Sequence, residues 1–160
     1  MLIEMAIKGL MVDPVTNMPI VLLRDDGNQR VLPIWVGPVE ANAIALQVEN
    51  VAPPRPMTHD LLRNLLTELG ATLVRVVIAD LRDSTFYAYL ELRVGSDVAF
   101  VDARPSDALA LCLRMRAPVF VDTNVLDRAR SVETTTEQVT RERLQKWLES
   151  LDPDDLGYKM

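Results

Sequence analysis

Several residue types that many enzyme classes and secreted folds need are scarce in this sequence. Its 160 residues include one cysteine, one histidine and 5% aromatic residues. A single cysteine cannot form an internal disulfide, and Cys112 stands between two leucines, so we expect a small buried hydrophobic residue there. HExxH, CxxC, EF-hand, Walker and GxGxxG motifs are absent from the sequence. These absences exclude an internal disulfide framework and give no support to the common zinc, calcium or nucleotide sites.

Long apolar runs and an excess of basic residues are missing as well. No apolar run approaches the length of a membrane span, about 20 residues, and no basic segment followed by a long apolar one stands at the N-terminus. We therefore expect a cytoplasmic protein that makes no membrane contact. The formal net charge of −6 argues against a broad basic surface for nucleic acid, so any contact with phosphates must be local.

What the sequence does contain is a degraded copy of itself. Placing Pro38 on Pro105 gives an offset of 67 positions (105 − 38). At this offset identical residues coincide, as in the pairs Asp13 and Asp80, Leu23 and Leu90, Ala41 and Ala108, and Leu46 and Leu113. The turn before the helix differs, because Gly37 corresponds to Arg104. We interpret the pattern as two versions of one supersecondary unit, the second with a polar turn.

The order of apolar and turn-forming residues predicts the secondary structure. The predicted strands are residues 2–12, 20–24, 30–34, 73–79, 85–93, 98–101 and 119–121. Two predicted helices begin at Pro38 and Pro105, and two more follow caps at Thr58 and at Asp122 or Thr123. The expected fold class is α+β. Two β3α2 repeats, about residues 1–70 and 71–130, form one barrel-like mixed sheet with helices packed outside it, plus a C-terminal helix.

The helix expected after the proline-rich segment 53–56 has the strongest pattern. Thr58 suits its N-cap and Gly70 suits the position just after its end. Leucines recur at helical spacing along it, and we expect them to be buried. They are Leu61, Leu62, Leu65, Leu66 and Leu69.

Residues 131–160 are predicted to lie beyond the domain formed by residues 1–130. Residues 131–136 have the composition of a linker, and an amphipathic helix follows. Its apolar residues are Leu144, Trp147, Leu148 and Leu151. Such a helix either covers the sheet or pairs with another subunit. Because the two-repeat core is complete without it, we favour the second role and expect a homo-oligomer, with a dimer as the simplest form.

Polar residues that suit hydrolysis gather at predicted strand ends and helix starts. They are His59, Asp60, Asp80, Arg82, Asp83, Asp102, Arg104, Ser106 and Asp107. Clustered carboxylates tolerate one another when they share a divalent cation, and such a cation activates water. Arginine binds phosphate in bidentate fashion, and histidine transfers protons near neutral pH. The same residues also have a purely structural interpretation. In that interpretation the acids stabilise helix starts, and Arg104 forms an ion pair with Asp102 or Asp107.

Four segments together resemble the bifunctional nuclease family: LPIWVGPVEANAIA, PPRPMTHDLLRNLLTELGA, VVIADLRDSTFYAYL and VDARPSDALALCLRMRAPVFV. The resemblance covers about residues 1–130. It implies a bacterial, soluble protein of two β3α2 repeats, with DNase and RNase activity attached to the family mainly through plant relatives. The family's strongest motifs fall on His59, Asp60, Asp80, Asp83, Asp102, Arg104, Ser106 and Asp107.

Residues and resemblance together lead us to expect a nuclease, a phosphodiester hydrolase that acts on DNA and RNA with low sequence specificity and uses Mg²⁺ or Mn²⁺. Asp102, Asp107 and Asp80 are the expected metal ligands. The other expected catalytic residues are His59, Asp60 and Asp83, and the expected phosphate-binding residues are Arg104, Ser106 and Arg82. The alternative is a non-enzymatic regulatory module that uses the same polar cleft to bind a ligand or a protein. A third interpretation is a repeat domain in which these residues only stabilise the fold.

Overall fold

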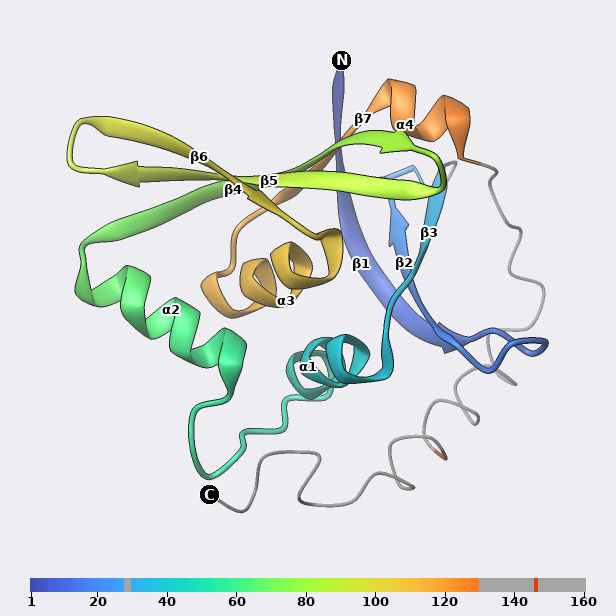
Figure 1. The fold of residues 1–160 in the computed structure, drawn as a ribbon, viewed down its shortest axis with the longest axis horizontal. Coiled ribbons are helices and arrows are strands. Elements are labelled where there is room, and N and C mark those ends of the chain that lie inside the picture. The colour runs from blue at the N-terminus through green and yellow to red at the C-terminus, as the bar shows by residue number, and fades with distance from the viewer. Residues whose placement is uncertain (28–29, 130–145, 147–160) are drawn as a thin grey trace.

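The computed structural model describes residues 1–27, 30–129 and 146. Within residues 1–129 it has an α+β fold of seven strands in one mixed sheet and four helices (Figure 1). The strands are β1 (Leu2–Val12), β2 (Pro19–Arg24), β3 (Val31–Trp35), β4 (Ala71–Arg82), β5 (Thr85–Val94), β6 (Asp97–Ala103) and β7 (Val119–Asp122). The helices are α1 (Pro38–Val48), α2 (Thr58–Glu68), α3 (Pro105–Met115) and α4 (Thr123–Arg128). The linker and amphipathic helix predicted within residues 131–160 lie outside the described residues.

The sheet consists of two antiparallel three-stranded segments joined by β7, which pairs antiparallel with β1. The strand order of the sheet is β3-β2-β1-β7-β4-β5-β6, and β7 pairs parallel with β4. Each three-stranded segment is followed by a helix whose first residue is a proline, Pro38 in α1 and Pro105 in α3. An N–H at this position has no hydrogen-bond partner within the helix. Proline suits the position because it has no N–H. The shared order of elements agrees with the two units of the sequence pattern, whereas the duplication itself stays a prediction.

The sheet is open, so the predicted barrel-like closure is wrong. β3 and β6 are its two edges. Closure would need a continuous ladder of hydrogen bonds between these edges. β3 has only five residues, with Pro33 at its centre, and proline has no N–H to donate to such a ladder. The proline therefore ends the sheet on this side.

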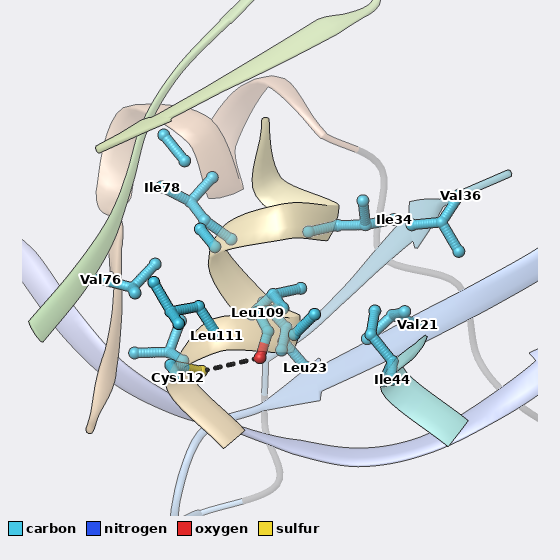
Figure 2. Packing of buried hydrophobic residues seen from close by; sticks show 14 of the residues in the cluster. Val21, Leu23, Ile34, Val36, Ile44, Val76, Ile78, Leu109, Leu111 and Cys112 are labelled. Atoms are coloured by element: carbon cyan, nitrogen blue, oxygen red, sulfur yellow. Dashed lines mark hydrogen bonds between the residues drawn. The ribbon is translucent and has the colours of Figure 1, made fainter. Parts of the chain in front are cut away.

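α3 is the central helix of the fold. α1, α2 and α3 lie on one side of the strands (Figure 1), and α4 lies next to β7 and β4, with its Val125 in the same buried cluster as Leu109 of α3. α3 contacts α1, α2, β4 and β5. Its Leu109 is fully buried and packs with residues such as Leu23 and Ile78 (Figure 2). Cys112 belongs to the same core, as predicted, and its thiol donates to the carbonyl oxygen of Leu109 at 3.2 Å.

The leucine stripe of α2 is not buried, which contradicts the sequence prediction. The exposed leucines are Leu61, Leu62, Leu65 and Leu69. Leu66 alone of the five packs partly against the core. The buried residues of α2 are instead His59 and Asp60, in its first turn. Because these polar side chains anchor the helix to its neighbours, the apolar stripe faces outward.

The predicted starts and ends of several elements are confirmed. β1 has the predicted bounds, and Gly70 follows α2 with a positive φ of 72°, the left-handed conformation that favours glycine. Asp122 caps α4 by accepting a hydrogen bond from the backbone N–H of Asn124 at 2.9 Å. No helix in the described part of the chain is long and apolar enough to span a membrane.

Candidate functional site

Three helix starts bring four ionisable side chains into one network. Glu40 lies in the first turn of α1, His59 in that of α2 and Asp107 in that of α3. Arg104 is the residue immediately before α3. Gly37, just before α1, leaves room for the Glu40 carboxylate, because a Cβ at this position would meet Oε2 of Glu40. We call Glu40, His59, Arg104 and Asp107 the helix-start cluster.

Arg104 is held by two carboxylates. Its Nε donates to Asp107 Oδ2 at 2.8 Å and its Nη2 to Asp107 Oδ1 at 3.2 Å, while its Nη1 lies 3.1 Å from Glu40 Oε1. The hydrogen bond and charge of Asp107, followed by those of Glu40, raise the pKa of Arg104 above its usual value. A guanidinium has five N–H groups, and this side chain is 64% exposed. The cation is therefore fixed in orientation and still presents donors to a ligand.

Asp107 links Arg104 to the single histidine. Its Oδ1 lies 2.9 Å from Nε2 of His59. Burial raises the pKa of the Asp107 carboxyl, but the hydrogen bonds and charges of Arg104 and His59 outweigh this effect, and the pKa is lower than usual. A carboxylate hydrogen-bonded to one ring nitrogen fixes the orientation of an imidazole. One carboxylate thus holds a guanidinium and an imidazole.

A pocket of about 270 Å³ opens beside the helix-start cluster. Glu40, Arg104 and Ser106 line its polar side. The other lining residues are Ile34, Trp35, Val36, Gly37, Ser84, Thr85, Phe86 and Pro105. A guanidinium, a carboxylate, hydroxyl groups and aromatic rings thus line one cavity.

A second group of predicted residues lines a groove of about 570 Å³ over β4, β5 and β6. The lining residues are Ala79, Asp80, Arg82, Tyr87, Ala88, Tyr89, Phe100 and Asp102. Asp80 lies 2.8 Å from Arg82 Nε and 3.1 Å from Arg128 Nη1 of α4. The guanidinium of Arg82 lies 4.2 Å from the ring centroid of Tyr87. Asp80, Arg82 and Asp102 therefore line a different cavity from the one beside Arg104.

Asp60 lies in neither cavity but in a buried ion pair. Its Oδ1 lies 2.7 Å from Arg114 Nε. The guanidinium of Arg114 also donates to the carbonyl oxygens of Ala43 and Ala110 at 3.0 and 2.8 Å, so the pair joins α1, α2 and α3. Burial raises the pKa of Asp60, but the hydrogen bonds from the Met57 N–H and from Arg114 lower it by more, so the pKa is below its usual value. We therefore assign Asp60 a structural position.

Asp83 lies in the turn between β4 and β5, with a positive φ of 48°. Short polar side chains such as aspartate tolerate this conformation. Asp83 lines neither of the two cavities. The structure thus joins His59, Asp107 and Arg104 by hydrogen bonds and places Ser106 with Arg104 in the lining of the smaller cavity. His59 and Asp107 line neither cavity, and Asp83 stands apart from all four.

Comparison with known sequences relates this chain to one domain family and to proteins of bacteria and plants. A model of the bifunctional nuclease domain matches residues 21–134. The chain belongs to the bifunctional nuclease domain family. An uncharacterised protein of Mycobacterium tuberculosis is 42% identical to it over 161 aligned positions, which cover 95% of this chain and 96% of that protein.

Two plant proteins of the bifunctional nuclease domain family are more distant. Bifunctional nuclease 1 of Oryza sativa subsp. indica is 25% identical over 116 positions, 71% of this chain and 35% of the plant protein. Bifunctional nuclease 2 of Arabidopsis thaliana is 29% identical over 106 positions, 64% of this chain and 32% of the plant protein. The chain thus matches about a third of each plant protein.

The predicted metal ligands do not form one group in this bifunctional nuclease domain. Among residues 1–27 and 30–129, no three histidine, cysteine, aspartate or glutamate side chains are placed to hold a metal ion. Both oxygens of Asp107 already contact Arg104 or His59. The oxygens of Asp80 contact two arginines and the N–H of Leu81. The observed arrangement of Asp102, Asp107 and Asp80 therefore does not fit Mg²⁺ or Mn²⁺.

Sequence reasoning missed several residues that shape the bifunctional nuclease domain. Glu40 is not among the predicted site residues, although its carboxylate contacts Arg104. It does not single out Arg114, yet a lone arginine within the apolar segment LALCLRM is a signal for a buried partner. Trp35 and Phe86 line the pocket beside Arg104, and no spacing pattern in the sequence indicates this.

Proposed function

We propose that this bifunctional nuclease domain hydrolyses phosphodiester bonds of DNA and RNA with low sequence specificity. The observation that carries the proposal is the Asp107 bridge. One carboxylate holds an exposed arginine at 2.8 Å and the single histidine of the sequence at 2.9 Å. The plant relatives are named bifunctional nucleases, which supports nuclease activity.

Arg104 binds the phosphate in this proposal. Non-bridging oxygens accept hydrogen bonds from the guanidinium N–H groups that Asp107 and Glu40 do not use. Negative charge grows on these oxygens as water attacks phosphorus, so the cation stabilises the transition state more than the ground state. The two carboxylates orient the guanidinium in advance, which reduces the entropy lost on binding.

His59 transfers the proton. Its Nε2 is bonded to Asp107, so Nδ1 is the nitrogen that exchanges a proton with the reacting groups. The oxygen of water bonds to phosphorus, the P–O ester bond breaks, and a proton passes by way of His59 from the water to the leaving oxygen. The negative charge of Asp107 stabilises the imidazolium that forms in between.

Trp35 and Phe86 supply contacts with the bases. Both line the pocket that contains Arg104. Stacking of a base on an aromatic ring is tolerant of sequence because every base has a π-face. A local arginine and two rings also agree with the net charge of −6, since no broad basic surface is needed.

Cleavage of labelled DNA and RNA oligonucleotides by the purified protein tests the proposal. We expect His59→Gln to lower kcat by about 100-fold or more, the usual contribution of a proton-transfer group. Arg116→Gln, at the other end of α3, is the matched control for Arg104→Gln and leaves cleavage unchanged.

Assays with Mg²⁺, Mn²⁺ or EDTA test the metal prediction, because EDTA abolishes a metal-dependent reaction. Absence of cleavage under all of these conditions contradicts the proposal.

A binding module without catalysis is the alternative function. The carboxylate of Asp107 is fully engaged by a cation and an imidazole, the arrangement of a structural clamp as well as of a catalytic pair. Oligonucleotide binding that weakens as salt rises, without cleavage, would support this alternative.

A further inference from the structure

The groove over β4, β5 and β6 lies on the face of these strands that points away from α3. Ala88 and Leu90 of β5 belong to the hydrophobic core, and α3 packs against this side of the strand. Successive side chains of a strand point to opposite faces. Tyr87 and Tyr89, which line the groove, therefore lie on the other face, which we call the outer face.

Strand pairing brings further groove residues to the outer face. Asp102 of β6 pairs with Tyr89, and Phe100 pairs with Glu91, two residues further along β5. Paired residues of neighbouring strands share a face, so Phe100 and Asp102 lie beside Tyr89. The ring centroids of Tyr89 and Phe100 are 5.7 Å apart, and the rings are nearly perpendicular, at 79°. Because Phe100 is 65% exposed, its ring is available to a ligand.

Two arginines meet at Asp80, which lines the same groove. Arg82 Nε and Arg128 Nη1 lie 2.8 and 3.1 Å from the Asp80 carboxylate. Two cations share one anion here, so this end of the groove is net positive. The arginine side chains are 61% and 57% exposed. Their remaining N–H groups can therefore donate to a phosphate.

The carboxylate of Asp102 is not engaged in this way. Within residues 1–27 and 30–129 it has no hydrogen-bond or ion-pair partner. A carboxylate accepts hydrogen bonds and donates none, so a ligand beside the aromatic rings needs an N–H group to satisfy it. The amino groups of adenine, cytosine and guanine are such donors, whereas thymine has a carbonyl oxygen where cytosine has its amino group.

We propose that the groove over β4, β5 and β6 binds single-stranded nucleic acid. The Phe100 ring stacks with a base, and Asp102 accepts a hydrogen bond from the amino group of that base. Arg82 binds an adjacent phosphate. In a duplex the bases stack on one another and their amino groups are paired, so only a single strand offers both to the groove.

The charges around the groove favour this ligand over other occupants. A cationic ligand would be repelled by Arg82 and Arg128, and the guanidinium of Arg82 already lies over the Tyr87 ring at 4.2 Å. An apolar peptide would cover the Asp102 carboxylate without a hydrogen bond, which is costly. A nucleic-acid strand supplies an anion for the arginines, a π-face for the ring and a donor for the carboxylate.

The groove adjoins the pocket that contains Arg104. Asp102 lines the groove, and Arg104, two residues further along the chain, lines the pocket. The backbone between them is extended, so their Cα atoms are about 7 Å apart at the rise of a strand. The β4–β5 hairpin likewise contributes Arg82 to the groove and Ser84 to the pocket. The inference rests on the proposed function for the identity of the ligand, and it makes single strands the substrate.

Fluorescence anisotropy of labelled oligonucleotides at fixed salt tests the preference for single strands. The full chain carries His59→Gln, so that the oligonucleotide stays intact. We expect a single strand to bind about tenfold or more tighter than the same sequence in a duplex, the effect of losing a stacked base. Equal or tighter binding of the duplex overturns the proposal, and so does the absence of binding.

Phe100→Leu in the same background tests stacking, because it keeps an apolar side chain and removes the ring. We expect the affinity for single-stranded oligo(dC) to fall by about fivefold or more. Val98→Ala is the matched control, since Val98 is an exposed residue of β6 that does not line the groove. An unchanged affinity in Phe100→Leu, or an equal loss in both variants, shows that stacking is wrong.

The role of Asp102 is tested by comparing oligo(dC) with oligo(dT). We expect the parent protein to bind oligo(dC) about fivefold or more tighter, because thymine has no amino group. Asp102→Asn removes this preference, since an amide N–H donates to the thymine carbonyl oxygen. A merely structural role of Asp102 changes both affinities alike. A ratio that Asp102→Asn leaves unchanged contradicts the assignment.

Binding and cleavage are measured separately, so the two proposals fail separately. If the wild type cleaves oligonucleotides while Phe100→Leu and Asp102→Asn bind them normally, the groove proposal is wrong and the proposed function stands. If both variants show the expected losses while the wild type cleaves nothing, the proposed function is wrong and the groove is a nucleic-acid site without catalysis.

Discussion

Asp60 and Asp107 occupy the same position, the third residue of a helix, yet their surroundings give them different roles. Asp60 pairs with Arg114, and both side chains are almost fully buried. Asp107 pairs with Arg104, which is mostly exposed. In both carboxyl groups burial raises the pKa, but the hydrogen-bond partners lower it by more, so the pKa is below its usual value. A buried pair stabilises the fold, whereas an exposed arginine can also bind a ligand.

Replacing Asp60 with asparagine tests the structural role of the buried pair. Asp60→Asn leaves the Arg114 guanidinium buried without its counter-charge, so we expect the free energy of unfolding at pH 7 to fall by about 3 kcal/mol. Asp127→Asn, at an exposed position of α4, is the matched control and changes it by less than about 0.5 kcal/mol. Urea unfolding measures both values. Equal effects of the two substitutions would contradict a structural pair.

The pH dependence of this difference has a defined sign. The folded-state pKa of Asp60 is lowered, so its contribution is fully present above the unfolded-state pKa, about 3.9, and is lost as the pH falls through the folded-state value. We therefore expect the stability gap between wild type and Asp60→Asn to be constant from pH 7 to pH 5 and to shrink below about pH 4. A gap that widens on acidification would have the wrong sign.

Cys112 gives a second prediction at the residue scale. Burial raises the pKa of its thiol to about 12, so the reactive thiolate is scarce at pH 8 and reagent cannot reach it. We expect the folded protein not to react with Ellman's reagent on the timescale on which the unfolded chain reacts fully. Absorbance of the released thiolate with and without guanidinium measures this. Rapid reaction without denaturant would show that Cys112 is accessible.

At the scale of elements, periodicity predicted where helices occur but not always which face they bury. The bounds of β1 and the start of α3 follow from alternation and from Pro105, which are local signals. The leucine stripe of α2 was expected in the core and is exposed instead. Local spacing cannot reveal that His59 and Asp60 have partners on α3, about 50 residues further along the chain. Long-range ion pairs decided the orientation of this helix.

The short helix α4, which packs next to β4 and β7, provides a further prediction. Val125 is fully buried there, although α4 has only six residues. We expect Val125→Ala to lower the free energy of unfolding by about 2 kcal/mol through lost burial and a residual cavity. Val39→Ala, at an 80% exposed position of α1, is the matched control and has an effect near zero. If both variants unfold at the wild-type urea concentration, α4 does not pack on the sheet as described.

At the scale of the whole molecule, the sequence predicted the α+β class and two sets of three strands. The open edges of the sheet and the positions of the site residues became known only from the structure. Sequence similarity cannot show that Pro33 leaves β3 as an edge. The polar residues were expected around one cleft. Asp80 and Asp102 instead line the groove over β4, β5 and β6, and Arg104 lines the pocket beside α3. The position of each loop relative to the others is a tertiary property that spacing does not encode.

The central claim is that the helix-start cluster carries the reaction and is more than a clamp. Asp107→Asn keeps the size of the side chain, removes its charge and separates the two roles. If the cluster is catalytic, the rate of oligonucleotide cleavage falls by about 100-fold or more, while the melting temperature falls by only about 2–5 °C, as expected for loss of a partly exposed ion pair.

Measuring the cleavage rate and the melting temperature of Asp107→Asn on one preparation tests this most directly. Our account predicts a large loss of rate in a protein that remains folded at the assay temperature. A melting temperature that drops while cleavage continues at the wild-type rate would contradict it.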